Sequence, residues 1–299
     1  MSDELKRIAD RLDDLVARLD ALLPGARREP DWKRSQAFRW RKDARGGYLE
    51  GVRHPHAIRF ADLKDIDEQK RRLRENTAQF VAGRPANNVL LTGARGTGKS
   101  SLVKAALAEF APKGLRLIEV DKRDLVDLPD IVDVIGDRPE RFILFCDDLS
   151  FEASDAGYKS LKVALDGSIA GSTDNLLVYA TSNRRHLMPE FMDENLEARH
   201  VDGEIHPGET TEEKISLSER FGLWLSFYPF DQEQYLEIAD HWVERLGGKP
   251  TEESRKAALL WALERGFRSG RVAWQFASDW VGRAKKGSDT FSRAKGKGI

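Results

Sequence analysis

The sequence contains Gly93-Ala94-Arg95-Gly96-Thr97-Gly98-Lys99-Ser100, which fits the pattern G-x-x-x-x-G-K-[ST]. This stretch follows the apolar run 88–91 and precedes a helical pattern over residues 100–110. Glycines at these positions let backbone N–H groups wrap around phosphates, and a helix that begins here points its positive N-terminal end at them. The stretch therefore predicts a phosphate-binding loop between a strand and a helix.

This loop predicts ATP and Mg²⁺ as ligands. The Lys99 ammonium would reach the β- and γ-phosphates, and the Ser100 hydroxyl would ligate Mg²⁺. The residues that we assign to nucleotide contact are Gly93, Ala94, Arg95, Gly96, Thr97, Gly98, Lys99, Ser100 and Ser101.

Two acids follow the apolar run 142–146, at the carboxyl end of an expected strand. We expect this strand to be the neighbour of the strand that precedes the phosphate loop, so that the two acids lie beside the loop. We assign Asp147 to the Mg²⁺ shell, through water, and Asp148 to orienting or deprotonating the attacking water. The single cysteine, Cys146, excludes an internal disulfide and a cysteine zinc cluster, and we expect it to be a buried core residue.

Outward from the loop, helical patterns alternate with short apolar runs over residues 56–230, which predicts an α/β domain with a mostly parallel sheet. Its five expected strands are 88–91, 115–120, 142–146, 176–181 and 223–227. Only helical patterns follow, so residues 231–284 are expected to form a small all-helical domain.

The two ends of the chain differ from this centre. Residues 1–25 carry a heptad seam, which predicts a coiled-coil-like helix or an amphipathic helix docked on its own domain; the seam residues are Leu5, Ile8, Leu12, Leu15, Leu19 and Leu22. Residues 26–55 are basic with interleaved aromatics, so we interpret them as a linker or arm, with nucleic-acid contact as the alternative. Residues 285–299 are expected to be a disordered basic tail.

Composition sets limits on the class of protein. The 49 Lys and Arg residues nearly cancel the 50 Asp and Glu residues, so any charged face that binds a partner must be local. One candidate is the acidic insertion 190–213, interpreted as a solvated loop or a contact for a basic surface. The apolar runs are far shorter than the roughly 20 residues of a transmembrane helix, and the first residues lack a signal core. We therefore expect a cytoplasmic protein without membrane contact.

Further polar residues lie at positions that suit nucleotide chemistry. Asn183 follows the expected strand 176–181, Arg220 precedes the strand 223–227, and Arg271 opens a helix of the C-terminal domain. Together with the loop and the two acids, these residues resemble the motifs of the AAA+ ATPases: Walker A, Walker B, a sensor after strand four, an arginine before strand five and an arginine in a helical lid.

The similarity is more specific to the bacterial family catalogued as domain of unknown function 815, over roughly residues 30–284. It rests on Asn87-Asn88-Val89-Leu90-Leu91, on the stretch 145–152, on Tyr179-Ala180-Thr181-Ser182-Asn183-Arg184-Arg185-His186-Leu187 and on Ser269-Gly270-Arg271. The resemblance implies a P-loop NTPase fold of the AAA+ type with a helical lid, and a homo-oligomer such as a hexameric ring. It implies that Asn183 is sensor 1, Arg220 an arginine finger for a neighbouring subunit and Arg271 sensor 2. It also implies that residues 58–67 pack against adenine.

Two departures from the AAA+ pattern bear on activity. Asp148 stands where many members have Glu, so slow hydrolysis, or water positioned by Glu152, is an alternative. No aromatic pore loop is found in residues 119–135, which weakens a polypeptide-threading function. The leading hypothesis is an ATPase that hydrolyses ATP at subunit interfaces and rearranges an unknown protein or nucleoprotein partner. A loader-like ATP switch with little turnover is the second hypothesis, and a small-molecule kinase is the third.

Overall fold

The computed structural model describes residues 29–55, 58–150, 156–166, 174–183, 199–201, 204–206 and 217–295. The predicted helix over residues 1–25, Glu152 and most of the acidic insertion lie outside these described residues. Within the insertion, only the short pair β7 (Arg199–Val201) and β8 (Glu204–His206) is described. No helix in the described part of the chain is both long enough and apolar enough to cross a membrane.

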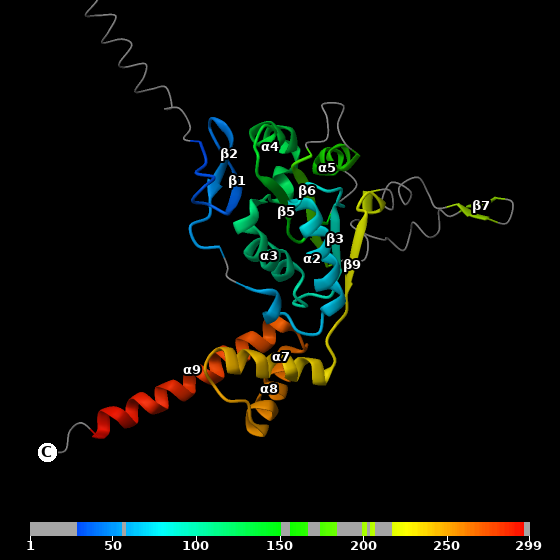
Figure 1. Ribbon diagram of the computed structural model, residues 1–299. Coiled ribbons are helices and arrows are strands. Elements are labelled where there is room, and N and C mark those ends of the chain that lie inside the picture. Colours follow the sequence, from blue (N-terminus) through cyan, green and yellow to red (C-terminus); the bar gives the residue numbers. More distant parts are fainter. Residues whose placement is uncertain are drawn as a thin grey trace, which may run out of the picture.

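The centre of the molecule is a seven-stranded sheet with the order β2-β1-β4-β5-β6-β3-β9 (Figure 1). Five of its strands are those predicted from the sequence, and they run parallel to one another: β3 (Val89–Gly93), β4 (Leu115–Glu119), β5 (Arg141–Cys146), β6 (Leu176–Ser182) and β9 (Leu223–Phe227). The α/β class is therefore confirmed. The expected adjacency of strands β5 and β3 is wrong, because β6 lies between them.

The remaining two strands come from the stretch interpreted as a basic arm. β1 (Ala37–Asp43) pairs parallel with β4, and β2 (Gly46–Gly51) returns antiparallel along β1. The prediction of five strands is thus corrected to seven, and the linker interpretation is wrong for residues 37–51. The physical reason is burial: Phe38 and Trp40 alternate with charged residues and place their rings in the core.

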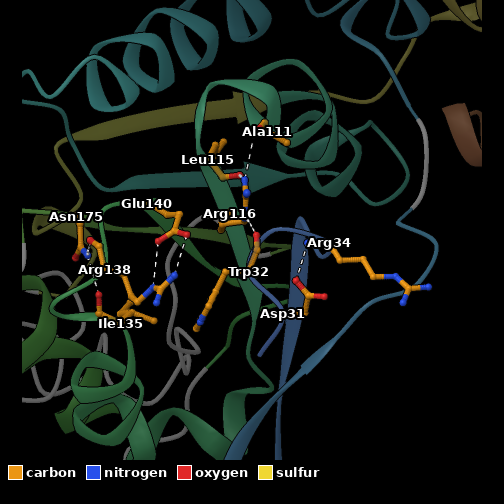
Figure 2. A network of polar contacts seen from close by, with 10 residues as sticks. All are labelled: Asp31, Trp32, Arg34, Ala111, Leu115, Arg116, Ile135, Arg138, Glu140 and Asn175. Atoms are coloured by element: carbon orange, nitrogen blue, oxygen red, sulfur yellow. Dashed lines mark hydrogen bonds and ion pairs between the residues drawn. The ribbon is translucent and has the colours of Figure 1, made fainter. Parts of the chain in front are cut away.

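Side chains from other elements hold this hairpin in the sheet. The Trp40 indole N–H donates to Asp127 Oδ2 (2.9 Å), and Lys42 Nζ lies 2.7 Å from the same oxygen. Figure 2 shows how the Arg116 guanidinium fixes the segment before β1: it donates to the carbonyl oxygens of Trp32, Ala111 and Leu115. These contacts hold Trp32, Trp40 and Lys42 against the sheet domain.

Helices cover both faces of the sheet, as the continuous apolar strands require. On one face, Val89 and Leu91 pack with the helices α2 (Asp67–Val81) and α3 (Lys99–Phe110). On the other, Leu90 and Leu144 pack with α4 (Leu128–Ile135) and α5 (Ala156–Asp166). Three short 3₁₀ helices join these elements: η1 (Phe60–Asp62), η2 (Ala111–Lys113) and η3 (Lys122–Asp127). Cys146 is buried in this core, which raises the pKa of its thiol to about 12, so its predicted core role is confirmed.

Three helices follow the sheet and form the predicted helical domain: α7 (Gln232–Arg245), α8 (Glu252–Arg265) and α9 (Gly270–Lys295). They lie together beyond the end of the sheet domain, and α9 extends away from it (Figure 1). Because α9 continues to Lys295, the prediction of a disordered tail is wrong for residues 285–295. This stretch contains Ala, Lys and Arg, which are good helix formers, and no proline.

Candidate functional site

A cavity of about 770 Å³ lies between the carboxyl ends of the strands and the helical lid. Its lining combines the predicted loop with residues from β6, from the segment before α2 and from the lid. The residues are Ile58, Asp62, Leu63, Lys64, Ile66, Arg95, Gly96, Thr97, Gly98, Lys99, Ser100, Ser101, Lys104, Asp147, Asp148, Thr181, Asn183, Phe230, Ile238, Trp242, Gly270, Arg271, Trp274 and Gln275.

The first two residues of the predicted loop form its support and do not line the cavity. The Ala94 N–H donates to the Phe227 carbonyl (3.1 Å), which joins the loop to the end of β9. Gly93 has φ +123°, and a Cβ built on it would lie 1.9 Å from the same carbonyl oxygen. Only glycine fits there, because both the backbone angle and the close approach exclude a side chain.

Lys99 lies at the start of α3 and is buried, with 6% of its surface exposed. Its ammonium donates to the carbonyl oxygens of Gly93 and Ala94 (2.7 Å each) and to Asn183 Oδ1 (3.1 Å). Burial lowers its pKa to about 8, although the charges of Asp147 and Asp148 act in the opposite direction. The lysine is therefore held at the cavity floor, in position for an anion.

Two hydroxyl groups converge on Asp147. Ser100 Oγ and Thr181 Oγ1 both donate to Asp147 Oδ1, each at 2.6 Å. The predicted metal residues, Ser100 and Asp147, are thus in direct contact, although β6 lies between β3, which precedes the loop, and β5, which precedes Asp147. Their oxygen atoms are the ligand type that Mg²⁺ prefers, so this pair fits the ion. Among the described residues, no cluster of three or more His, Cys, Asp or Glu offers an alternative metal site.

Asp148 and Asn183 form a second polar pair beside Lys99. Asn183 Nδ2 donates to Asp148 Oδ1, while its amide oxygen accepts from Lys99. Asp148 has a left-handed backbone with φ +54°, which is uncommon for a residue with a side chain. Four residues that the sequence predicts as site residues therefore line the same part of the cavity: Lys99, Asp147, Asp148 and Asn183.

The lid contributes Arg271 to the cavity, from the first turn of α9. The backbone of α9 also contacts the loop directly, because the Gly270 N–H donates to the Gly96 carbonyl (2.9 Å). A Cβ on Gly96 would lie 2.7 Å from Ser269 Oγ, so the lid and the loop are packed against each other.

Arg220 is not brought into this cavity. It lies in the turn before β9, and its guanidinium forms an ion pair with Asp166 at the end of α5. Its predicted role as a finger concerns a neighbouring subunit, so a position outside its own cavity is compatible with that prediction, which stays untested.

Several residues that line or adjoin the cavity were not predicted from the sequence. Thr181 carried a visible signal, since it is a polar residue at the end of an apolar strand. Trp242 and Trp274 carried none, because their place in the wall depends on how the lid docks.

The buried Asp62 on η1 forms an ion pair with Arg245 of α7, and this contact joins the two domains next to the cavity. The apolar residues Ile58, Leu63 and Ile66 lie in the stretch expected to pack against adenine.

The sheet domain with its helical lid has a fold similar to that of solved AAA domains. The AAA domain of FIGL-1 in complex with ADP is similar to this chain with a TM-score of 0.51 and 18% identity, over 75% of this chain and 72% of that one. The Orc1 protein of Aeropyrum pernix in complex with DNA has a TM-score of 0.51 and 15% identity, over 76% of this chain and 65% of that one.

The chain itself belongs to the family described as Protein of unknown function (DUF815), whose model matches residues 33–284. The RuvB Holliday junction branch migration motor of Thermotoga maritima has a TM-score of 0.47 and 16% identity over 71% of this chain, which spans 60% of that motor's length. No curated protein sequence matches the chain.

Proposed function

We propose that this protein is an ATPase that binds ATP with Mg²⁺ and hydrolyses it at the interfaces of a homo-oligomer. One observation carries the proposal: Lys99, Ser100, Asp147, Asp148, Asn183 and Arg271 converge on one cavity between the sheet and the lid. The ADP in the similar FIGL-1 domain supports a nucleotide as the ligand. Ile58, Leu63 and Ile66, together with Trp242 and Trp274 of the lid, would provide an apolar surface for the base.

The residues of the cavity divide the chemistry among them. Lys99 would neutralise the β- and γ-phosphates, and the loop amides would hold them at the N-terminus of α3. Bound through Ser100 and Asp147, Mg²⁺ would neutralise charge that develops on the phosphate oxygens. Asp148 would orient the attacking water, and Asn183 holds that carboxylate in place. Arg271 would stabilise the γ-phosphate from the lid.

Arg220 would complete the site of a neighbouring subunit. It lies outside its own cavity, and an arginine supplied from another chain can increase the rate of phosphoryl transfer by about 10³ to 10⁵. We further propose that turnover moves the lid and thereby rearranges a protein or nucleoprotein partner.

The test combines ATPase assays with native mass measurements of the full chain, with and without ATP. The Lys99→Ala variant should lose nucleotide binding, whereas Arg220→Ala should bind ATP and lose turnover. Mixed together, the two inactive variants should regain activity, because Arg220 of one chain completes the loop of the other. Full activity of Arg220→Ala would overturn the interface site, and absence of ATP binding by the wild type would overturn the proposal.

A second candidate is an ATP-dependent switch with little turnover. It is favoured by Asp148, whose shorter side chain is already engaged by Asn183. Its nucleic-acid version is disfavoured by the hairpin, where Arg39, Arg41 and Lys42 form ion pairs with acidic residues of the same chain. Single-turnover kinetics separate the two candidates: the switch should bind ATP tightly, assemble and release phosphate over hours.

A further inference from the structure

Thr181 occupies the last part of β6, between the strand that carries the acids and the strand that carries the loop. It lines the cavity, yet only 2% of its surface is exposed. The neighbouring strands therefore enclose its side chain. Its hydroxyl has two defined hydrogen-bond partners.

The Thr181 hydroxyl uses both of its hydrogen-bonding functions on the two acids. It has one proton to donate, and this goes to Asp147 Oδ1 at 2.6 Å. It accepts from the backbone N–H of Asp148 at 2.9 Å. One side chain therefore contacts the carboxylate of the first acid and the backbone of the second.

These two contacts act on the orientation of the Asp147 carboxylate and on the backbone conformation of Asp148. Asp147 Oδ1 also accepts from Ser100, so two hydroxyls from different elements restrict the rotation of this carboxylate. Asp148 has the left-handed backbone, which costs energy for a residue with a Cβ and persists only where its surroundings hold it. The bond from its amide to Thr181, and that from the Leu149 amide to the Thr181 carbonyl (2.6 Å), supply this hold.

We propose that Thr181 is a positioning residue for the metal and for the attacking water. Its hydroxyl fixes the carboxylate of Asp147 for Mg²⁺ and stabilises the turn that presents Asp148 to Asn183. The inference rests on the proposed function, because it assigns a task to Thr181 in that same nucleotide site.

Removal of the hydroxyl alone provides the test. Thr181→Val keeps the shape of the side chain and deletes both hydrogen bonds, whereas Thr181→Ser keeps the hydroxyl and deletes a methyl group. The matched control is Thr77→Val, since Thr77 is also fully buried but contacts the Leu73 carbonyl and the Tyr179 hydroxyl, away from the cavity. Two quantities are measured. The first is the affinity for ADP without metal, and the second is the affinity of the ADP complex for Mn²⁺, which is determined by electron paramagnetic resonance.

We expect all four proteins to bind ADP alike without metal. Thr181→Val should bind Mn²⁺ about 10- to 100-fold more weakly, as is typical when a partner of a metal ligand is removed. Thr181→Ser and Thr77→Val should remain close to the wild type. If Thr181→Val does not fold, Thr181→Ala provides the same comparison without a methyl group facing the Asp148 amide.

Two results would overturn the inference: unchanged Mn²⁺ affinity in a folded variant that lacks the hydroxyl, or an equal loss in Thr181→Ser, which would assign the effect to packing. Failure of the wild type to bind ADP would instead refute the proposed function itself. The two failures are thus distinguishable.

Discussion

The two walls of the proposed nucleotide cavity are built differently. The sheet wall consists of the loop 95–101 with Asp147, Asp148, Thr181 and Asn183. A continuous set of hydrogen bonds runs from Lys99 through Asn183, Asp148, Thr181 and Asp147 to Ser100. The lid wall consists of Ile238, Trp242, Gly270, Arg271, Trp274 and Gln275, and Trp274 is 46% exposed. This difference indicates that the groups proposed to contact phosphate and metal hold one another in position. The closure of the site depends instead on contacts between the sheet domain and the lid.

The largest effect is expected at the base of the sheet wall. Gly93→Ala would place a Cβ 1.9 Å from the Phe227 carbonyl oxygen, on a backbone with φ +123°. The overlap and the backbone strain should together lower the free energy of unfolding by more than about 3 kcal/mol. Urea unfolding followed by circular dichroism measures this loss.

Gly114→Ala is the matched control for that substitution. Gly114 has φ +96°, but nothing lies within 4 Å of a Cβ placed there. It should cost only the backbone strain, about 1–2 kcal/mol. An equal loss in both variants would show that the sheet wall tolerates movement at β9, contrary to a preorganised site.

The lid wall should be less sensitive, and Asp62→Asn tests how strongly it is attached. The substitution removes the charge that pairs with Arg245 of α7 while keeping the shape of the side chain. Because the Arg245 side chain is 38% exposed, water replaces part of the lost interaction, and we expect a loss of about 1–2 kcal/mol in the free energy of unfolding. Glu75→Gln, which removes an exposed ion pair with Arg71, should change it by less than about 0.5 kcal/mol. A loss no larger than this control would remove Asp62 from the attachment of the lid.

The protonation of Lys99 gives the sheet wall a distinctive pH dependence. Phosphates bind the charged ammonium, and the pKa of Lys99 in the free protein is lowered to about 8. The affinity for ADP should therefore fall as the pH rises through 8, by about tenfold between pH 7 and pH 9. Isothermal titration calorimetry across this range measures the change. Lys99→Arg retains its charge at these pH values, so its affinity should stay flat, and a parallel fall in both proteins would assign the effect to other groups.

The sheet wall was also the part of the site that the sequence could predict. Its loop is continuous in sequence, and the acids at 147 and 148 follow the apolar run 142–146. The place of β6 between β5 and β3 could not be predicted, because strand order depends on contacts between distant segments. For the same reason the lid tryptophans and the Asp62–Arg245 pair were missed.

The hairpin β1–β2 is a different case, because its signal was present. Residues 38–41 alternate aromatic and charged side chains, and only Ala44 and Arg45 separate Asp43 from Gly46 and Gly47, as expected for a tight β-hairpin. The high content of Arg and Lys favoured the interpretation as an arm. In the structure these charges form ion pairs with acids on β2, β4 and η3, so alternation was the more informative feature.

The smallest effect is expected where the two walls meet. Gly96→Ala would place a Cβ 2.7 Å from Ser269 Oγ, which should push the start of α9 away and weaken the bond from the Gly270 N–H to the Gly96 carbonyl. The loss of one such bond corresponds to about a fivefold lower affinity for ADP. Gly266→Ala has nearly the same positive φ and no neighbour within 4 Å, so it should retain wild-type affinity. The double variant Gly96→Ala with Ser269→Gly should recover part of the loss, because the clashing side chain is gone. Without recovery, the effect of Gly96→Ala would lie within the loop itself, and the contact between the walls would not control the closure of the site.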